Sequence, residues 1–312
     1  MATERDAPLD LRGYTMAVLG GDGREVEIAR QALFCGASVR VCGLPPVDVE
    51  GITVCSDIRD AVFGADIVVC PVPLPEADGS IYAPYAPSKL VVDRNTLEGM
   101  RMGGILITGR ASAQMREAAT ALDLKLHEYE HVEDLMLLRA PAVAEGAIRL
   151  AIEHTAVTLH GNSVMVVGYG NIGSVLAGML RGLGARVTVA ARNPVQRARA
   201  WALGCDTVPI QEMTERIPNM VVVFNTAPAL LFTSDVLCHF GPETLLIDLS
   251  APPGGVDFRA ADELGVKTIW ARGLGGRAPR TVGQIQWIGI KRILESELLQ
   301  REGLTGGTGS VA

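Results

Sequence analysis

The sequence predicts an α/β protein with two doubly wound parallel-sheet domains and a cleft between them. Short apolar runs of buried-strand character alternate with helix-like segments along the chain. Two of these runs lead into a glycine-rich turn and then a helix, at residues 20–23 and 168–173. The 312 residues are enough for two domains of ordinary size. We therefore expect two Rossmann-like domains.

The composition of the chain argues against several classes of function. The chain is 48% hydrophobic and 20% charged, which is typical of a soluble protein with a substantial core. Its net charge of -7 argues against nucleic acid as a partner, and no apolar stretch is long enough to span a membrane. The polar N-terminus lacks the apolar region of a signal peptide, so we expect a cytoplasmic protein. The six cysteines and five histidines show no metal-ligand spacing, which favours buried free thiols and no metal site.

The domain boundaries follow from the glycine turns and the long helical patterns. Residues 1–130 form an N-terminal Rossmann-like or flavodoxin-like domain, with a proline-rich loop at 71–88. A linker helix at 131–160, broken or kinked at Pro141, leads to an NAD(P)-binding Rossmann domain at 161–280. A C-terminal helix at 281–300 is expected to pack back on the domain junction, followed by a disordered tail at 301–312.

The second glycine turn carries the cofactor prediction. It reads G-Y-G-N-I-G, and it lies between an apolar run and an amphipathic helix, which is the context that a dinucleotide fingerprint requires. Gly168 permits the tight turn, Gly170 lets the backbone approach a pyrophosphate, and Gly173 allows the helix to pack on the strand. The predicted cofactor contacts here are Gly168, Tyr169, Gly170, Asn171, Ile172 and Gly173.

The end of the next strand selects between the two nicotinamide cofactors. NAD-binding domains usually carry an acidic residue about 20 residues past the motif. Here that stretch is Ala-Ala-Arg192-Asn193, with Arg197 one helical turn on, and no acid. An arginine grips a 2′-phosphate with parallel hydrogen bonds, so NADP is favoured and NAD remains an alternative.

Later strand ends and the first glycine turn supply further candidates. Asn225, Thr226 and Ser250 follow apolar strands at the edge where a cofactor would lie. The turn at 20–23 lacks the dinucleotide spacing, and Asp22 stands where phosphates would lie. That turn either binds a substrate anion or only reverses the chain. Arg110, after another strand, is a candidate for binding a carboxylate.

Several longer stretches resemble one family, dipicolinate synthase A, which is the first of the two components of dipicolinate synthase. The resemblance covers residues 12–300 and is carried by VLGGDGREVEIAR, PAVAEGAIRLAIEHT, the cofactor unit GYGNIGSVLAGMLRGLGARVTVAAR, and the late loops NTAP, DLSAPPGGVDF and GLGGRAPRTVGQI. Asn171 and Ile172 depart from the family's usual glycine motif. Gly275, Arg280 and Gly283 stand where the family usually has proline, lysine and alanine.

The resemblance implies a reaction and a partner. The family oxidises the cyclic dicarboxylate made by dihydrodipicolinate synthase to pyridine-2,6-dicarboxylate during sporulation, in the mother cell. It works with a second, flavoprotein-like component, dipicolinate synthase B, and a homo-oligomer is also compatible with the sequence. A dicarboxylate requires cationic or N–H-rich loops, which Arg110, Gly254, Gly255, Arg277 and Arg280 supply. Candidate catalytic bases are Glu145, His154 and Asp257, among which the sequence does not choose.

Two other functions compete with this hypothesis. One is a dehydrogenase of another amino or keto acid on the same fold, against which the late loops argue. The other is an NADP-binding regulatory or scaffold subunit that holds the flavoprotein while that partner performs the redox step. All three bind the same cofactor, so cofactor binding alone does not separate them.

Overall fold

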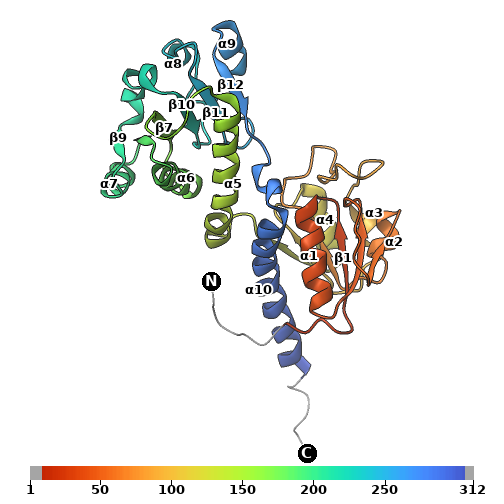
Figure 1. The fold of residues 1–312 in the computed structure, drawn as a ribbon. Helices are drawn as coiled ribbons and strands as arrows, with labels where there is room; N and C mark the ends of the chain where they lie inside the picture. The colour runs from red at the N-terminus through yellow and green to blue at the C-terminus, as the bar shows by residue number, and fades with distance from the viewer. Residues whose placement is uncertain (1–8, 306–312) are drawn as a thin grey trace, which may run out of the picture. The chain divides into compact units, whose positions relative to one another are not determined.

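The computed structural model describes residues 9–305, with side chains to residue 300. The chain divides into two compact units. Of the described residues, the first unit contains 9–136 and 278–305, and the second contains 137–277. Each unit holds one six-stranded sheet, so the predicted α/β class with two parallel sheets is confirmed (Figure 1).

The first unit has strand order β3-β2-β1-β4-β5-β6, and every pairing is parallel. Its strands are β1 (Thr15–Leu19), β2 (Ser38–Cys42), β3 (Ile52–Val54), β4 (Ile67–Val69), β5 (Ile105–Thr108) and β6 (Lys125–Glu128). Its helices are α1 (Gly23–Phe34), α2 (Ile58–Val62), α3 (Arg94–Leu97), α4 (Ala113–Ala121) and α10 (Pro279–Thr305). The strand order reverses direction between β1 and β4, which places the topological switch point at the carboxyl end of β1.

The C-terminal helix α10 belongs to this first unit and packs along α1. The two helices approach closely at Gly283, where an added Cβ would lie 2.6 Å from the Cβ of Glu27. Gln284 donates a hydrogen bond to the Glu27 carboxylate at 3.2 Å. The helix continues past residue 300, where the sequence predicted its end.

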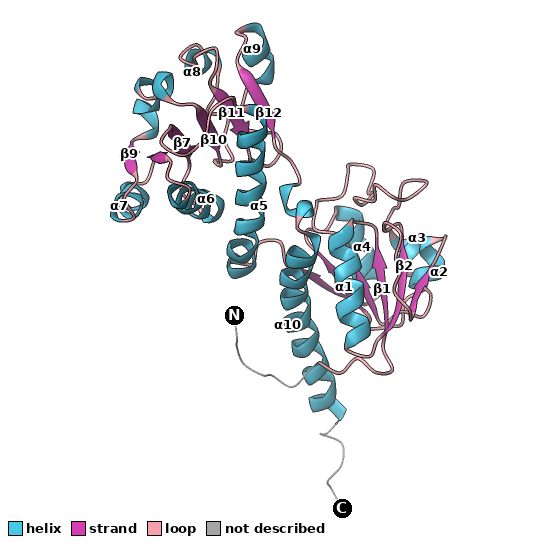
Figure 2. Cartoon of the chain, in the orientation of Figure 1, coloured by secondary structure: helices cyan, strands magenta, loops and turns pink. Residues whose placement is uncertain are grey.

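The second unit repeats the topology, with order β12-β11-β10-β7-β8-β9 and all pairings parallel (Figure 2). Its strands are β7 (Ser163–Val167), β8 (Arg186–Ala190), β9 (Asp206–Val208), β10 (Val222–Asn225), β11 (Leu245–Asp248) and β12 (Lys267–Trp270). Its helices are α5 (Glu133–His154, which begins in the first unit), α6 (Asn171–Gly182), α7 (Pro194–Ala202), α8 (Ser234–Leu237), α9 (Phe258–Glu263) and the 3-10 turns η1 (Ile210–Glu215), η2 (Ile217–Asn219) and η3 (Leu274–Arg277).

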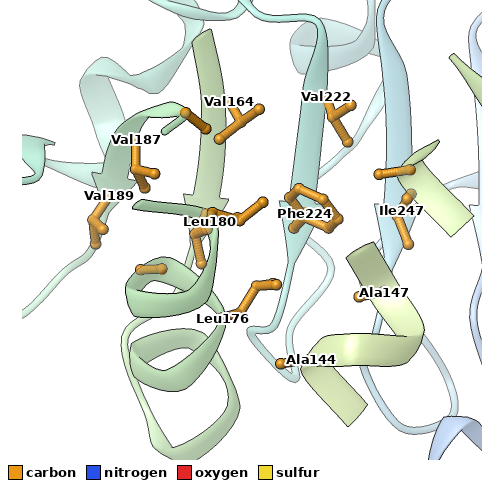
Figure 3. Packing of buried hydrophobic residues seen from close by; sticks show 14 of the residues in the cluster. Ala144, Ala147, Val164, Leu176, Leu180, Val187, Val189, Val222, Phe224 and Ile247 are labelled. Carbon is orange, nitrogen blue, oxygen red and sulfur yellow. The ribbon is translucent and has the colours of Figure 1, made fainter. Parts of the chain in front are cut away.

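The core beside this sheet explains why α5 and α6 lie against it. Ala144 and Ala147 of α5 meet the central strands at Phe224 and Ile247 (Figure 3). Leu176 of α6, which is itself fully buried, belongs to the same cluster. Alanines allow α5 to lie close to the strands, while the leucines of α6 fill the space beside β7 and β8. This packing orients α6 from the carboxyl edge of the sheet toward its amino edge.

Several elements differ from the sequence-based expectation, among them the short helices α2, α3, α8 and α9, which were not predicted. Strand β3 was not predicted, because it is a short edge strand with mostly exposed side chains and gives no apolar run. Of the two effects expected at Pro141, a break is wrong, because Pro141 lies inside the continuous helix α5.

The cysteines among the described residues are free, but only Cys42, Cys70 and Cys205 are buried, whereas Cys35 and Cys55 are half-buried and Cys238 is exposed. Burial raises the pKa of Cys42 to about 11 and that of Cys70 to about 12, so both thiols stay protonated at neutral pH.

Candidate functional site

The turn at residues 168–173, which we call the cofactor turn, connects β7 to α6 at the switch point of the second sheet. Gly168 has φ +92°, and an added Cβ would lie 2.5 Å from the Thr226 Oγ1. At Gly173 an added Cβ would lie 2.4 Å from the Gly168 carbonyl oxygen. Both positions therefore require glycine for the fold itself, as the motif predicted.

Gly170 differs from these two glycines because the protein leaves open space beside it instead of packing against it. An added Cβ would meet no atom within 4 Å, and φ is an ordinary -88°. Gly170 is also the N-cap of α6, and no side chain caps this helix end. The N-terminal N–H groups and the positive end of the helix dipole are therefore available to an anion. This open, uncapped turn fits the pyrophosphate of a dinucleotide.

The other residues of the motif have separate roles. Tyr169 is buried in the hydrophobic core of the second unit, and burial raises its pKa. Its backbone, and not its ring, thus belongs to the turn. Asn171 and Ile172 form the partly exposed first turn of α6. Thr226 donates its hydroxyl to the Val167 carbonyl at 2.9 Å, which fixes the end of β10 beside the turn.

A buried carboxylate that sequence reasoning missed organises the neighbouring strand ends. Asp248, at the end of β11, has no exposed surface and accepts four hydrogen bonds. Asn225 donates at 2.9 Å, the Ser250 amide and hydroxyl donate at 3.0 and 2.7 Å, and the Gly255 amide donates at 2.8 Å. Cofactor contact by Asn225 and Ser250 stays a prediction; in this structure their polar groups hold the strand ends together. An acid that ends the apolar run LLID was the signal available in the sequence.

The same carboxylate shapes the loop after β11. Gly254 has φ +96°, and at Gly255 an added Cβ would lie 2.0 Å from the Asn225 amide nitrogen. The Trp270 indole donates to the Ser250 carbonyl at 3.1 Å. The glycine loop is thus fixed at the carboxyl edge of the sheet, next to the strand ends where α/β proteins bind ligands.

The three residues predicted to contact a phosphate at the end of β8 have different surroundings in the structure. Arg192 is exposed. Asn193 is the N-cap of α7 and accepts from the Val195 amide at 2.8 Å. Arg197 donates to the carbonyls of Ala191 and Arg192 at 2.7 and 2.9 Å, so its guanidinium supports the turn. Asn193 is exposed as well, but its side-chain oxygen already caps α7, so Arg192 is the exposed one of the three whose side chain has no such structural role here.

The three candidate bases lie in different parts of the second unit. His154 ends α5, which leads into the amino end of β7, and its Nδ1 lies 2.9 Å from the Leu150 carbonyl oxygen. Glu145 is exposed and faces the last turns of α6. Asp257 is exposed, follows the loop at the carboxyl end of β11, and caps α9 by accepting from the Ala260 amide at 3.0 Å. Of the three, only Asp257 lies at the edge that carries the cofactor turn.

The predicted carboxylate contacts are divided between the two units. Arg110 and Arg280 belong to the first unit, and Gly254, Gly255 and Arg277 belong to the second. Arg110 forms an ion pair with Glu130 at 3.4 Å, while Arg277 and Arg280 are exposed. The arginines thus remain available at the surface of their units.

The turn at residues 20–25, which we call the N-terminal turn, is closed by its own side chains. Asp22 caps α1, and its amide donates to Glu25 at 2.8 Å in a reciprocal capping box. The Arg24 guanidinium donates two hydrogen bonds to the Asp22 carboxylate, both at 2.9 Å. Glu25 is fully buried, and burial raises its pKa to about 7. Of the two open alternatives, chain reversal is the one that this packing favours.

We searched the described residues for clusters of metal ligands and for membrane-spanning helices. Residues 9–305 contain no cluster of three or more potential metal ligands. Within the same range, no helix is long and apolar enough to cross a membrane.

Comparison with known proteins assigns the class and then the family. The NAD-binding domain of D-isomer-specific 2-hydroxyacid dehydrogenases matches residues 139–250, and the N-terminal domain of dipicolinate synthase A matches residues 15–130. Fold, turn and match together define a dehydrogenase-type oxidoreductase with a nicotinamide cofactor. Dipicolinate synthase A of Bacillus subtilis (strain 168) is 30% identical over 296 residues, 94% of this chain and 99% of that protein. The chain belongs to the dipicolinate synthase A family.

Solved structures agree over nearly the whole length. The crystal structure of dipicolinate synthase A from Bacillus halodurans has a TM-score of 0.83 at 28% identity, covering 91% of this chain and 99% of that one. The crystal structure of its Bacillus subtilis counterpart has a TM-score of 0.82 at 30% identity, covering 94% and 99%. An L-alanine dehydrogenase, at 18% identity and a TM-score of 0.60, covers 92% of this chain and 91% of that one and shares the fold.

Proposed function

We propose that this chain is the NADP-linked catalytic component of a dipicolinate synthase. It would oxidise a cyclic six-membered dicarboxylate to pyridine-2,6-dicarboxylate during sporulation, in the cytoplasm of the mother cell, together with dipicolinate synthase B. The observation that carries the proposal is the open, uncapped position at Gly170, in a chain that matches the family over almost its full length.

The residues of the second unit divide the work of binding the cofactor. The cofactor turn offers backbone N–H groups to the pyrophosphate, and Arg192 offers its guanidinium to a 2′-phosphate. Thr226 fixes the turn from the neighbouring strand. When bound, an oxidised nicotinamide supplies a hydride acceptor.

The substrate loses a hydride and a proton as its ring becomes aromatic. We assign the proton to Asp257, because it is the candidate base at the carboxyl edge of the sheet. Asp248 keeps the adjacent glycine loop in place through the Gly255 amide. The arginines at 110, 277 and 280 are the proposed partners of the two substrate carboxylates. Aromatisation drives the reaction, so positioning is the main task of these groups.

The activity test uses the full chain, the cyclic dicarboxylate and NADP, with and without the purified flavoprotein-like partner. Formation of reduced nicotinamide without that partner is the expected result. Gly170→Asp should abolish it, because a carboxylate at this open position repels the pyrophosphate. Turnover that needs the flavoprotein and survives Gly170→Asp would instead establish the scaffold function.

The assignment of the base has its own test. Asp257→Asn retains an N-cap residue, so α9 should keep its stability. Loss of a general base should lower kcat by about 100-fold or more. NADP affinity should stay unchanged. A variant with normal kcat would remove Asp257 from the mechanism while leaving the proposed reaction intact.

A further inference from the structure

An arginine on the loop after β12 lies over an aromatic ring. The Cζ atom of Arg272 is 5.1 Å from the centre of the Trp270 ring, within the range of a cation–π contact. The Trp270 indole donates to the Ser250 carbonyl at 3.1 Å, and the ring stacks on Phe258 with centroids 5.4 Å apart at an interplanar angle of 26°. Trp270 is therefore fixed from two neighbouring segments, and it gives Arg272 a rigid support.

The guanidinium of Arg272 has no other role in the packing. Arg272 is exposed, and within residues 9–300 no oxygen atom is bonded to its side chain. Arg110, by contrast, is paired with Glu130, and Arg197 donates to backbone carbonyls. Contact with a ring leaves the five N–H donors of a guanidinium available. An exposed, oriented guanidinium with free donors is suited to binding a carboxylate through two parallel hydrogen bonds.

The position of Arg272 in the sheet indicates which anion it meets. Arg272 follows β12, whereas Arg192 follows β8, on the other side of the cofactor turn in the strand order. In this topology each half of the sheet holds one half of a dinucleotide, so the nicotinamide half lies toward β10, β11 and β12. The nicotinamide ring carries no negative charge. An arginine on this side is therefore placed for an anionic substrate and not for the 2′-phosphate.

The same stack leads to the proposed base. Phe258, whose ring contacts Trp270, is the first residue of α9, and Asp257 is the N-cap of that helix. Asp257 and Arg272 thus lie at the two ends of one short series of contacts at the carboxyl edge of the sheet. A carboxylate bound at Arg272 would bring the substrate ring to the edge that carries the base.

We propose that Arg272 binds one carboxylate of the substrate and thereby sets the preference for a dicarboxylate. This assignment rests on the proposed function, and it adds a residue to the arginine candidates at 110, 277 and 280. Trp270 is a positioning residue, because holding the Arg272 side chain in place reduces the conformational entropy lost on binding. A ring with a single carboxylate leaves one cationic subsite unpaired and binds less tightly.

The primary test measures the affinities of pyridine-2,6-dicarboxylate and pyridine-2-carboxylate for the full chain with saturating NADP, by isothermal titration calorimetry. The wild type should prefer the dicarboxylate by about 30-fold or more, and Arg272→Ala should reduce this preference to about threefold or less. Arg259→Ala is the matched control, because it removes an exposed arginine of α9 that is paired with Glu263 at 3.0 Å. The control should keep the preference, and NADP affinity should stay unchanged in both variants.

Two substitutions test the support beneath Arg272. Trp270→Phe and Trp270→Leu both remove the indole donor, but only Trp270→Leu also removes the aromatic face. Trp270→Leu should therefore bind the dicarboxylate about fivefold more weakly than Trp270→Phe, with thermal melting showing both variants folded. Equal affinities of the two variants would overturn the positioning role of the ring.

The outcomes separate this assignment from the proposed function. If Arg272→Ala keeps the dicarboxylate preference, the assignment is wrong and the proposed reaction stands. If that variant loses affinity for NADP instead, Arg272 belongs to the cofactor site and the assignment is again wrong. A wild-type chain that binds the two acids equally would contradict the proposed substrate itself, and the role of Arg272 with it.

Discussion

The two sheets share one strand order, and in both the first strand leads through a glycine-rich turn into a helix at the switch point. The two turns nevertheless differ in whether side chains cap the helix that follows. At the N-terminal turn, Asp22 and Glu25 satisfy the helix end themselves. At the cofactor turn, Gly170 caps α6 without a side chain and leaves the helix end open. Topology creates an anion site in both units, and two carboxylates fill it in one of them.

The largest effect is expected where the cofactor turn packs on itself. Gly173→Ala places a Cβ 2.4 Å from the Gly168 carbonyl oxygen, and should lower the free energy of unfolding by about 3 kcal/mol. Urea denaturation measures this. Gly178→Ala, in the same helix with no atom within 4 Å of the added Cβ, is the control and should be neutral or stabilising. Equal stability of the two variants would contradict the packing argument.

Gly170→Ala should separate binding from folding. The added methyl group meets no protein atom, so the free energy of unfolding should change by less than about 1 kcal/mol. It occupies the approach of the pyrophosphate, so NADP affinity should fall about 100-fold, or about 2.7 kcal/mol. Fluorescence titration with NADP gives the affinity. An unchanged affinity would place the nucleotide elsewhere.

The N-terminal turn should make the free energy of unfolding depend on pH through Glu25. Burial raises the pKa of Glu25 from 4.5 to about 7, so the folded state favours the protonated carboxyl. The stabilising contribution of that proton is complete below pH 4.5 and is lost as the pH rises through 7. Glu25→Gln retains the capping acceptor but cannot ionise.

As the pH rises from about 5 to about 8, the wild type should therefore lose about 2 kcal/mol of unfolding free energy relative to Glu25→Gln. Denaturant titrations at several pH values measure it. Glu117→Gln, at an exposed position of α4, is the control and should show no such trend. A difference that does not vary with pH would mean that Glu25 is ionised throughout.

The smallest effect concerns the choice of cofactor at the second turn. Arg192→Ala should weaken NADP binding by about tenfold and leave NAD binding unchanged, because only NADP carries the 2′-phosphate. Arg199→Ala removes the same charge from an exposed position on α7 and should change neither affinity. Parallel titrations with both nucleotides decide this. Equal losses for NADP and NAD would assign Arg192 to another part of the nucleotide.

Most of the second unit was predictable because its signals are local. The apolar runs, the glycine spacing and the absence of an acid after β8 all lie within short stretches of sequence. The roles of Asn225 and Ser250 were not predictable in this way. Their polar groups bond to Asp248, which lies 23 residues beyond Asn225, so its role appears only when β10 and β11 pair.

The sequence by itself determined the two parallel-sheet domains, the dinucleotide turn and the family, because strand periodicity and glycine geometry act over a few neighbouring residues. Tertiary structure decided that the N-terminal turn is filled by Glu25, that Asp248 joins the strand ends, and that Phe258 stacks on Trp270. Burial and contact between distant segments are properties of the packed chain. No local pattern of residues specifies them.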